Sequence, residues 1–360
     1  MSFSYDAARG AGRGRPATPL RHNLLNAVTA KVERVTGEDG NTFIRKELRR
    51  PCAAGVGGAG EVGLGGWAAS EAPRHWNYWR REVEVYRDAG VRERLTGTGL
   101  GLPEGGVEEF SGGAVLWLED VAGRPGTEFA LADHAALALG CGRWQARPAP
   151  EREWTSTGFL RDYSTTRDVP WEVLDDDAAW RQPLVADSWP AGLRRAWAEL
   201  VAHRGELLTI VEQSPRAQCH LDLWVSNVIR RPDGEIALLD WAFTGDGALG
   251  EDIGNHIPDA VFDLFWPAER IGELAETCLG SYLEGLREGG WRGEPAVVRR
   301  AVMASMVKYA WLLPLVLAKA ANPSHAAYHQ QVDSQRLFQQ RGLAFEFVAD
   351  WAAEALKGRR

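Results

Sequence analysis

The sequence predicts an α+β protein in two parts, a small strand-rich N-terminal part and a larger, mainly helical C-terminal part. Residues 28–48 contain two extended runs around a turn-rich cluster, which is typical of a hairpin. From residue 131 onward, apolar residues recur at three- and four-residue spacing in several segments, which predicts amphipathic helices. Within the helical part, residues 217–255 contain a second short hairpin with polar side chains near its ends.

We expect three segments along the chain. Residues 1–20 predict a disordered tail, because Arg, Gly and Ala dominate much of it. Residues 21–120 form the N-terminal part, with a flexible glycine-rich linker at 51–72, and residues 121–360 form the C-terminal part. Inside the linker, residues 55–60 match G-x-G-x-x-G. Neither an apolar strand before them nor a helical period after them supports a dinucleotide site.

The composition is that of a soluble globular protein, with 45% hydrophobic and 25% charged residues. A formal net charge of -8 without a basic run argues against a nucleic-acid binder. The most apolar stretch, 301–321, is interrupted by Lys308, Pro314 and Lys319, so it predicts a buried helix and no membrane segment. The four cysteines are far apart and indicate reduced thiols in a cytoplasmic protein.

A lysine stands on the second strand of the first hairpin. Ile44, Lys46 and Leu48 share one face of that strand, because side chains alternate with period two. A lysine between two apolar neighbours is either an edge charge or a cation held in a cleft, and the strand alone leaves both open. A helix predicted over residues 75–92 follows the linker and carries Glu82 and Glu84.

The segment 217–255 contains the densest set of polar residues with a defined spacing. His220, Asp222 and Asn227 form H-x-D-x-x-x-x-N, a Pro-Asp-Gly turn follows, and a short apolar run ends on Asp240. A hairpin brings Asp222, Asn227 and Asp240 to one edge. Such oxygen donors, without a cysteine, suit a hard cation such as Mg2+. Together with a carboxylate that accepts a hydroxyl proton, they suit phosphoryl transfer.

Two other interpretations of this segment remain open. The acidic residues could be scattered over a surface loop without a shared function. His256 could join His220, Asp222 and Asp240 in a metal-dependent hydrolase, although neither histidine has the i, i+4 spacing of a zinc pair and Asn227 would have no role.

On these motifs the chain resembles the aminoglycoside phosphotransferase family, which includes choline and homoserine kinases and shares the protein-kinase-like fold. The similarity lies in H-x-D-x-x-x-x-N, in the strand that ends in Asp240-Trp241, and in residues 250–253, which resemble the end of a further family motif. It covers roughly residues 25–290 in order. After Asp222 the sequence Leu-Trp-Val-Ser departs from the His-Pro-Gly of many relatives.

The resemblance implies a two-lobed fold and a role for each residue of the hairpin. Asp222 would be the catalytic base, and Asn227 and Asp240 would hold Mg2+ on the phosphates. His220 and Asp252 would brace the catalytic loop.

The resemblance also implies a nucleotide site in the smaller lobe. Lys46 would neutralise the α- and β-phosphates, and Glu82, in a local R-E-x-x-x-Y pattern, would orient it. Residues 113–118 would be the hinge strand, and the backbone of Glu119, Asp120 and Val121 would bind the adenine. Residues 36–41 are the only nearby candidate for a loop over the phosphates.

The expected function is ATP-dependent, or possibly GTP-dependent, phosphorylation of a hydroxylated small molecule, such as an antibiotic or natural product, by a monomer or homodimer. An antibiotic-resistance-type kinase is the first interpretation. A metabolic kinase of choline- or homoserine-like substrates and a nucleotide-binding pseudoenzyme are the alternatives. Asp259 and Asp263 are candidates for the acceptor pocket, although a solvated helix face fits them better.

Overall fold

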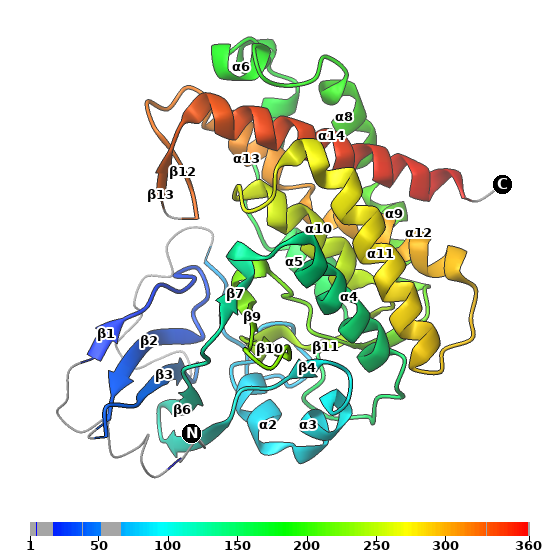
Figure 1. Cartoon of the computed structure of the whole chain (residues 1–360). Coiled ribbons are helices and arrows are strands. Elements are labelled where there is room, and N and C mark those ends of the chain that lie inside the picture. Colours follow the sequence, from blue (N-terminus) through cyan, green and yellow to red (C-terminus); the bar gives the residue numbers. More distant parts are fainter. Residues whose placement is uncertain (1–4, 6–16, 38, 52–65, 329, 359–360) are drawn as a thin grey trace.

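The computed structural model describes residues 5, 17–37, 39–51, 66–328 and 330–358. A β-sheet region forms the N-terminal part, and helices dominate the C-terminal part (Figure 1). The α+β architecture predicted from the sequence, with a strand-rich N-terminal part and a mainly helical C-terminal part, is therefore confirmed. Most of the predicted tail and of the glycine-rich linker, including the G-x-G-x-x-G match, lies outside the described residues.

The N-terminal sheet has five antiparallel strands in the order β1-β2-β3-β6-β5. The strands are β1 (Ala17–Pro19), β2 (Thr29–Thr36), β3 (Thr42–Arg49), β6 (Gly113–Glu119) and β5 (Gly105–Phe110). The hairpin and the hinge strand expected from the sequence correspond to β2–β3 and β6. Residues 17–19 correct the predicted tail, because they pair with Val35, Arg34 and Glu33 of β2.

The helix predicted over residues 75–92 is wrong in its extent. The structure has two short helices instead, α2 (Arg81–Arg87) and α3 (Ala89–Leu95). Asp88 is extended and its side chain accepts a hydrogen bond from the amide of Gly90, so it ends one helix and caps the next. Trp79 and Val83 pack under the sheet, which explains the apolar spacing that suggested one helix.

The hairpin predicted within residues 217–255 lies in a second sheet, below the C-terminal helices in Figure 1. Its order is β4-β10-β9-β7, with β4 (Leu100–Gly101), β10 (Ile236–Leu238), β9 (Val228–Arg230) and β7 (Arg124–Pro125). A separate pair joins β8 (Arg216–Cys219) to β11 (Gly245–Ala248). Gly234, in the turn between β9 and β10, has a φ of 96°, a conformation that favours glycine.

The C-terminal part is built from helices around one large core. They are α4 (Leu131–Gln145), α5 (Phe159–Thr165), α6 (Asp177–Trp180), α7 (Pro183–Ala186), α8 (Leu193–Ala202), α9 (Arg204–Glu212), α10 (Glu251–Phe262), α11 (Ile271–Glu288), α12 (Pro295–Ser305), α13 (Leu312–Ala318) and α14 (Ser334–Lys357). The 3-10 turns are η1 (Gly126–Glu128), η2 (Trp171–Leu174), η3 (Val225–Asn227), η4 (Trp241–Phe243), η5 (Ala268–Arg270) and η6 (Met306–Tyr309). A hairpin of β12 (His325–Ala327) and β13 (Gln330–Val332) precedes α14.

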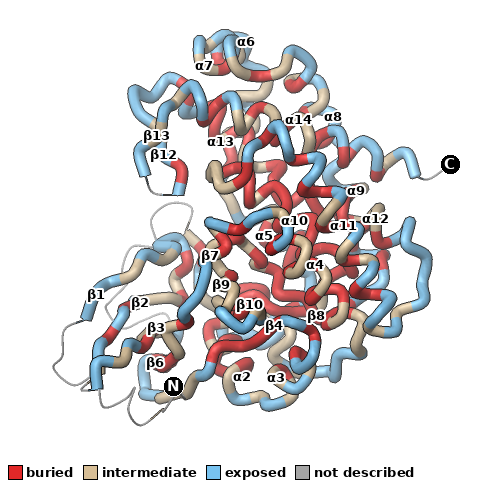
Figure 2. Tube along the Cα trace, in the orientation of Figure 1, coloured by how far each residue is buried: buried red, intermediate tan, exposed pale blue. Residues whose placement is uncertain are grey.

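The core lies where these helices meet the catalytic sheet (Figure 2). Among its largest fully buried side chains are Trp144, Trp197 and Trp241. At Gly142 of α4 and Gly285 of α11, an added Cβ would meet backbone atoms of the facing helix, so glycine allows the two helices to approach closely.

The apolar stretch predicted as one buried helix is buried but interrupted. It runs through α12, the η6 turn and α13. By length and composition, residues 295–318 could cross a membrane, but most of this segment is buried inside the structure, as in the core helix of a soluble protein. The η6 turn carries Lys308, one of the residues that interrupt the apolar pattern.

Candidate active site

The hairpin β9–β10 brings the polar motif residues together. Asn227 ends the η3 turn just before β9, and Asp240 follows β10 with a left-handed φ of 56°. The amide of Leu239 donates to the carbonyl oxygen of Asn227 at 2.8 Å, which holds the two strand ends together. A non-glycine residue in this conformation is uncommon, and the Asp240 side chain here reaches Lys46 of the N-terminal sheet.

Asp222 and Asn227 form one unit on the catalytic loop. The side-chain Nδ2 of Asn227 donates to the backbone oxygen and to Oδ2 of Asp222, at 3.0 Å in each case. Burial raises the pKa of Asp222 to about 7, the charges of Asp240 and Asp259 add to the rise, and that of Lys308 opposes it. Asp222 is therefore a carboxylate whose proton affinity suits proton transfer near neutral pH.

Lys46 is a buried cation on an inner strand of the N-terminal sheet, which excludes the interpretation as an edge charge. The residue lies on β3 and is 6% exposed, and its Nζ lies 2.6 Å from Oε2 of Glu82 and 2.8 Å from Oδ1 of Asp240. Burial lowers the pKa of Lys46, but the two carboxylates outweigh it and raise the pKa above its ordinary value. Glu84 pairs instead with Arg80 on the surface of the same helix.

His220 and Asp252 hold the backbone of the catalytic loop. The carboxylate of Asp252 accepts from the amides of His220 at 2.8 Å and Leu221 at 2.7 Å, and from the side chain of Gln145 at 2.6 Å. Nε2 of the His220 ring lies 3.0 Å from the carbonyl oxygen of Leu239 and can donate to it. These bonds join the loop, α4 and α10, and they fit the bracing roles implied by the family motif.

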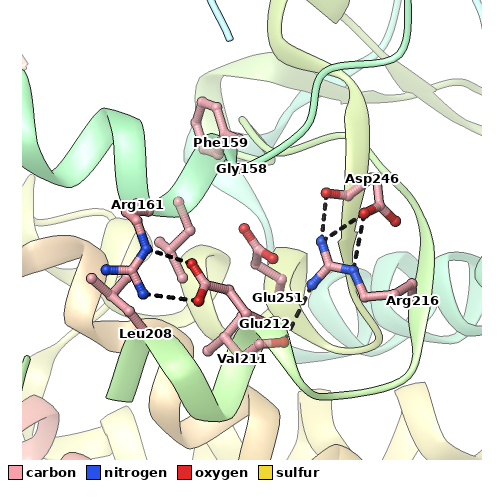
Figure 3. Close-up of a pocket in the computed structure, with 10 residues that line it drawn as sticks. Gly158, Phe159, Arg161, Leu208, Val211, Glu212, Arg216, Asp246 and Glu251 are labelled. Carbon is pink, nitrogen blue, oxygen red and sulfur yellow. Dashed lines mark hydrogen bonds and ion pairs between the residues drawn. The ribbon is translucent and has the colours of Figure 1, made fainter. Parts of the chain in front are cut away.

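Glu251, the neighbour of Asp252 in α10, lines a small hollow of its own (Figure 3). Its Oε2 accepts from the amide of Ala248 at 2.9 Å, and burial raises its pKa to about 7. Two ion pairs flank the hollow, between Arg161 and Glu212 and between Arg216 and Asp246. The two adjacent acidic residues of this motif therefore have different surroundings, and only Asp252 contacts the catalytic loop.

The predicted hinge residues have side chains committed to other partners. Both carboxylate oxygens of Glu119 bind Arg231, at 2.5 and 2.8 Å, and both oxygens of Asp120 bind Arg34, at 2.6 and 3.1 Å. Within the described residues, the backbone amide of Val121 donates no hydrogen bond. Any contribution of Glu119 and Asp120 to nucleotide binding would therefore come from the backbone.

His256 is not available as a metal ligand with His220. One ring nitrogen lies 2.9 Å from a ring nitrogen of His134 and the other lies 2.9 Å from the carbonyl oxygen of Leu223. Burial lowers the pKa of His134 to about 3 and that of His256 to about 4, so both rings are neutral. No cluster of three or more His, Cys, Asp or Glu residues in the described part of the chain could hold a metal ion.

A site for a hard cation with few protein ligands does fit the hairpin. The carboxylate of Asp240 is 42% exposed although Lys46 binds one of its oxygens. Because Nδ2 of Asn227 is engaged by Asp222, its amide oxygen remains as a donor, and no described residue hydrogen-bonds to it. Asn227 and Asp240, at the two strand ends of the hairpin, therefore offer two oxygen donors, and Mg2+ takes few protein ligands of this kind.

Sequence reasoning missed several residues around this site. Arg81 is fully buried and donates to five backbone carbonyl oxygens, among them that of Ala242 next to the Asp240 turn. Asp259 is only partly exposed, and burial raises its pKa to about 6 although Lys308 lowers it, so the preferred interpretation of a solvated face is wrong. Asp263 contacts Arg341 and the amide of Tyr328. For these residues, the only signal in the sequence was that Lys308 interrupts the apolar run of residues 301–321.

Comparison with known proteins agrees with this geometry. Residues 79–293, more than half of the chain, match the phosphotransferase enzyme family. No curated protein sequence matches the chain. The fold is similar to that of amicoumacin kinase hAmiN in complex with AMP-PNP, Ca2+ and Ami, with a TM-score of 0.50, 16% identity, and coverage of 93% of this chain and 88% of that one.

An aminoglycoside phosphotransferase from Alicyclobacillus acidocaldarius subsp. acidocaldarius DSM 446 has a TM-score of 0.53 and 15% identity, over 99% of this chain and 96% of that one. At these identities the structures establish the fold, and the family match establishes the enzyme class. The chain therefore belongs to the phosphotransferase enzyme family and is a small-molecule kinase.

Proposed function

We propose that the protein transfers the γ-phosphoryl group of ATP to a hydroxyl of a small molecule, an antibiotic or another natural product. The carrying observation is the contact of 2.8 Å between Lys46 and Asp240, next to the Asp222–Asn227 pair. A buried cation for phosphates, oxygen donors for a metal and a carboxylate of raised pKa are the three components that phosphoryl transfer needs.

Each residue has a role that follows from its contacts. The Asp222 carboxylate accepts the proton of the acceptor hydroxyl as the oxygen attacks the γ-phosphorus, and ADP leaves with the electrons of the broken P–O bond. Nζ of Lys46, positioned by Glu82, donates to oxygens of the α- and β-phosphates. Asn227 and Asp240 would hold Mg2+, which when bound neutralises charge on the phosphates.

The hinge offers a place for the base of the nucleotide. The backbone amide of Val121, two residues after β6, donates to no described residue and can donate to a ring nitrogen of adenine. The Glu119–Arg231 ion pair ties the strand end to the catalytic hairpin, so the base and the phosphates would be held at a constant separation. GTP remains the alternative donor, because backbone recognition can be satisfied by either purine.

An antibiotic acceptor is supported by the fold shared with amicoumacin kinase and with an aminoglycoside phosphotransferase. A metabolic acceptor is the alternative within the same chemistry. A pseudoenzyme is disfavoured, because a protein that only binds nucleotide has no need for Lys46, Asp222, Asn227 and Asp240 together.

The test is mass spectrometry of pooled hydroxylated antibiotics and metabolites after incubation with Mg-ATP or Mg-GTP. Wild type and Asp222→Asn are compared, with EDTA-treated wild type as the metal control and calorimetry as the measure of nucleotide binding. We expect a product heavier by one phosphoryl group with wild type and Mg2+ only. Failure of wild type to bind either nucleotide would show that the assignment of this site is wrong.

A further inference from the structure

Arginine side chains gather between helix α3 and strand β8. Arg94 lies on α3, and its Nη1 donates to the side-chain oxygen of Gln218 on β8. Nη2 of Arg94 donates to the carbonyl oxygen of Arg147 at 2.8 Å. In return, Nη1 of Arg147 donates to the carbonyl oxygens of Arg94 and Thr96, at 2.6 and 2.9 Å. These bonds join two arginines and one glutamine from three separate segments of the chain.

Arg152 reaches the same helix. Its Nε donates to the carboxylate of Asp88, and its Nη2 lies 3.0 Å from the point where a Cβ would stand on Gly90. Residues four apart on a helix are neighbours on one face, so Arg152 lies against the face of α3 that carries Arg94. The other oxygen of Asp88 accepts from the amide of Gly90 at 2.9 Å. The carboxylate of Asp88 is therefore committed to the start of α3 and to Arg152.

The arginine cluster, made of Arg94, Arg147, Arg152 and Gln218, carries more positive charge than its partners neutralise. Among the described residues, Arg152 forms an ion pair with Asp88, whereas Arg94 and Arg147 bind carbonyl and amide oxygens and no carboxylate. Three guanidinium groups thus share one carboxylate, and two positive charges are left over. An arginine does not lose its proton in a protein, so this excess charge persists at every working pH.

Three members of the cluster have buried N–H groups without an acceptor. Nε of Arg94, Nη1 of Arg152 and Nε2 of Gln218 donate to no described residue, although all three nitrogens are buried. Gln218 is 4% exposed and the side chain of Arg152 is 10% exposed. Buried donors are nearly always paired in folded proteins. Because the three arginines are each partly exposed, a ligand can reach these unused donors from solvent.

We propose that the arginine cluster binds a phosphate-type dianion, either inorganic phosphate or the terminal phosphoryl group of a small molecule. A phosphate group carries about 1.5 to 2 negative charges and offers three acceptor oxygens. It therefore balances the excess charge and can accept from three side chains at once. A carboxylate has one charge and two coplanar oxygens, which suit a single guanidinium fork better than donors from separate segments.

The arginine cluster is separate from the proposed nucleotide site. In the described part of the chain, none of its members shares a hydrogen bond or an ion pair with Lys46, Glu82 or Asp240. Binding of phosphate at this cluster therefore does not depend on the proposed phosphotransferase chemistry, and it can be measured without nucleotide and without metal.

Backbone connects the arginine cluster to the catalytic loop. Gln218 stands two residues before His220, whose amide donates to Asp252 at 2.8 Å. An anion that binds Arg94 and Gln218 together would hold α3 against β8, the strand that leads into this loop. We therefore expect bound phosphate to slow amide hydrogen exchange in α3 and β8.

The test is calorimetric titration of wild type with inorganic phosphate, in EDTA and at constant ionic strength. Acetate and glycerol 3-phosphate are the other two probes. We expect saturable binding of phosphate, and about 10- to 100-fold weaker binding of acetate, which loses a contact to a charged donor. Tighter binding of glycerol 3-phosphate than of inorganic phosphate would identify a phosphorylated small molecule as the ligand. The reverse order would identify the free ion.

Variants locate the phosphate. Arg94→Met should lower phosphate affinity by about 10- to 100-fold and remove the protection of α3 and β8. Arg299→Met is the matched control, because Arg299 already pairs with Glu276 at 2.6 Å, and it should keep the wild-type affinity. If Arg94→Met unfolds, Arg147→Gln removes another cation of the cluster and should give the same loss.

Thermal unfolding separates an anion site from a purely structural arginine. Loss of a structural contact lowers the unfolding temperature equally in chloride and in phosphate. Loss of the anion site removes only the additional stability that phosphate gives to wild type, because a ligand stabilises the state that binds it.

Absence of saturable phosphate binding in wild type would overturn the proposal. Phosphate affinities that are alike in wild type, Arg94→Met and Arg147→Gln would also overturn it, because the ion would then bind elsewhere. A wild type that binds phosphate but phosphorylates no acceptor would count against the proposed function and would support this site.

Discussion

The two sides of the candidate site treat charge differently. On the nucleotide side, Lys46 contacts Glu82 and Asp240 at 2.6 and 2.8 Å. Around Asp222, Lys308 acts on the carboxylates of Asp222 and Asp259 through its charge, without an ion pair to either. Both lysines are almost completely buried.

This difference indicates what each side requires of its ligand. Paired charges keep their geometry before the ligand arrives, so the nucleotide side is preorganised by the protein. Charges without partners shift the pKa values of their neighbours and remain available for a new contact. The geometry around Lys46 is therefore fixed by ion pairs, whereas the charges around Asp222 act on one another without such pairs.

The largest expected effect is on the acceptor side, at the catalytic carboxylate. Asp222→Asn should lower kcat by about 10² to 10⁴, because the group that accepts the hydroxyl proton is lost while its shape remains. Mg-ATP affinity, measured by calorimetry, should change little. Asp246→Asn, in the surface ion pair with Arg216, is the control and should leave kcat unchanged. A reduction below tenfold would contradict the role of Asp222.

The next effect tests whether the nucleotide side is preorganised. Lys46→Met leaves the buried carboxylate of Glu82 without its cation and should lower the free energy of unfolding by about 3–5 kcal/mol. Urea denaturation measures the loss. Lys31→Met removes a lysine that is 52% exposed and pairs with Glu33, and it should cost less than about 1 kcal/mol. Equal losses would show that the Lys46 pairs add little to the stability of the fold.

The smallest effect is a shift in pH dependence. Because burial raises the pKa of Asp222 to about 7, kcat/KM should fall about tenfold per pH unit below pH 7 as the base becomes protonated. Asp240 and Asp259 raise this pKa and Lys308 lowers it, so Lys308→Met should move the acid limb to higher pH. Lys319→Met, which changes an exposed lysine, is the control and should not move it. If the acid limb of the wild-type pH profile lay near the ordinary pKa of an aspartate, the raised pKa of Asp222 would be contradicted.

Local spacing was sufficient to predict the hairpin and its polar ends. A turn between two short apolar runs determines which residues stand at the strand ends, so Asn227 and Asp240 could be placed without a structure. The alternation along β3 likewise put Lys46 on the face of Ile44 and Leu48. The long helix at 75–92 was wrong, because packing under the sheet and the Asp88 cap produce the same apolar spacing as a helix.

The fold class, the β9–β10 hairpin and the order of motifs could be predicted, because they depend on neighbours along the chain. The surroundings of Asp222 could not, because they depend on how distant segments pack together. Lys308 reads as an interruption of an apolar helix, and Asp259 as a solvated acid. Lys308 is buried where η6 packs against α10, and its charge and that of Asp259 both act on Asp222, an influence between distant residues that no local pattern encodes.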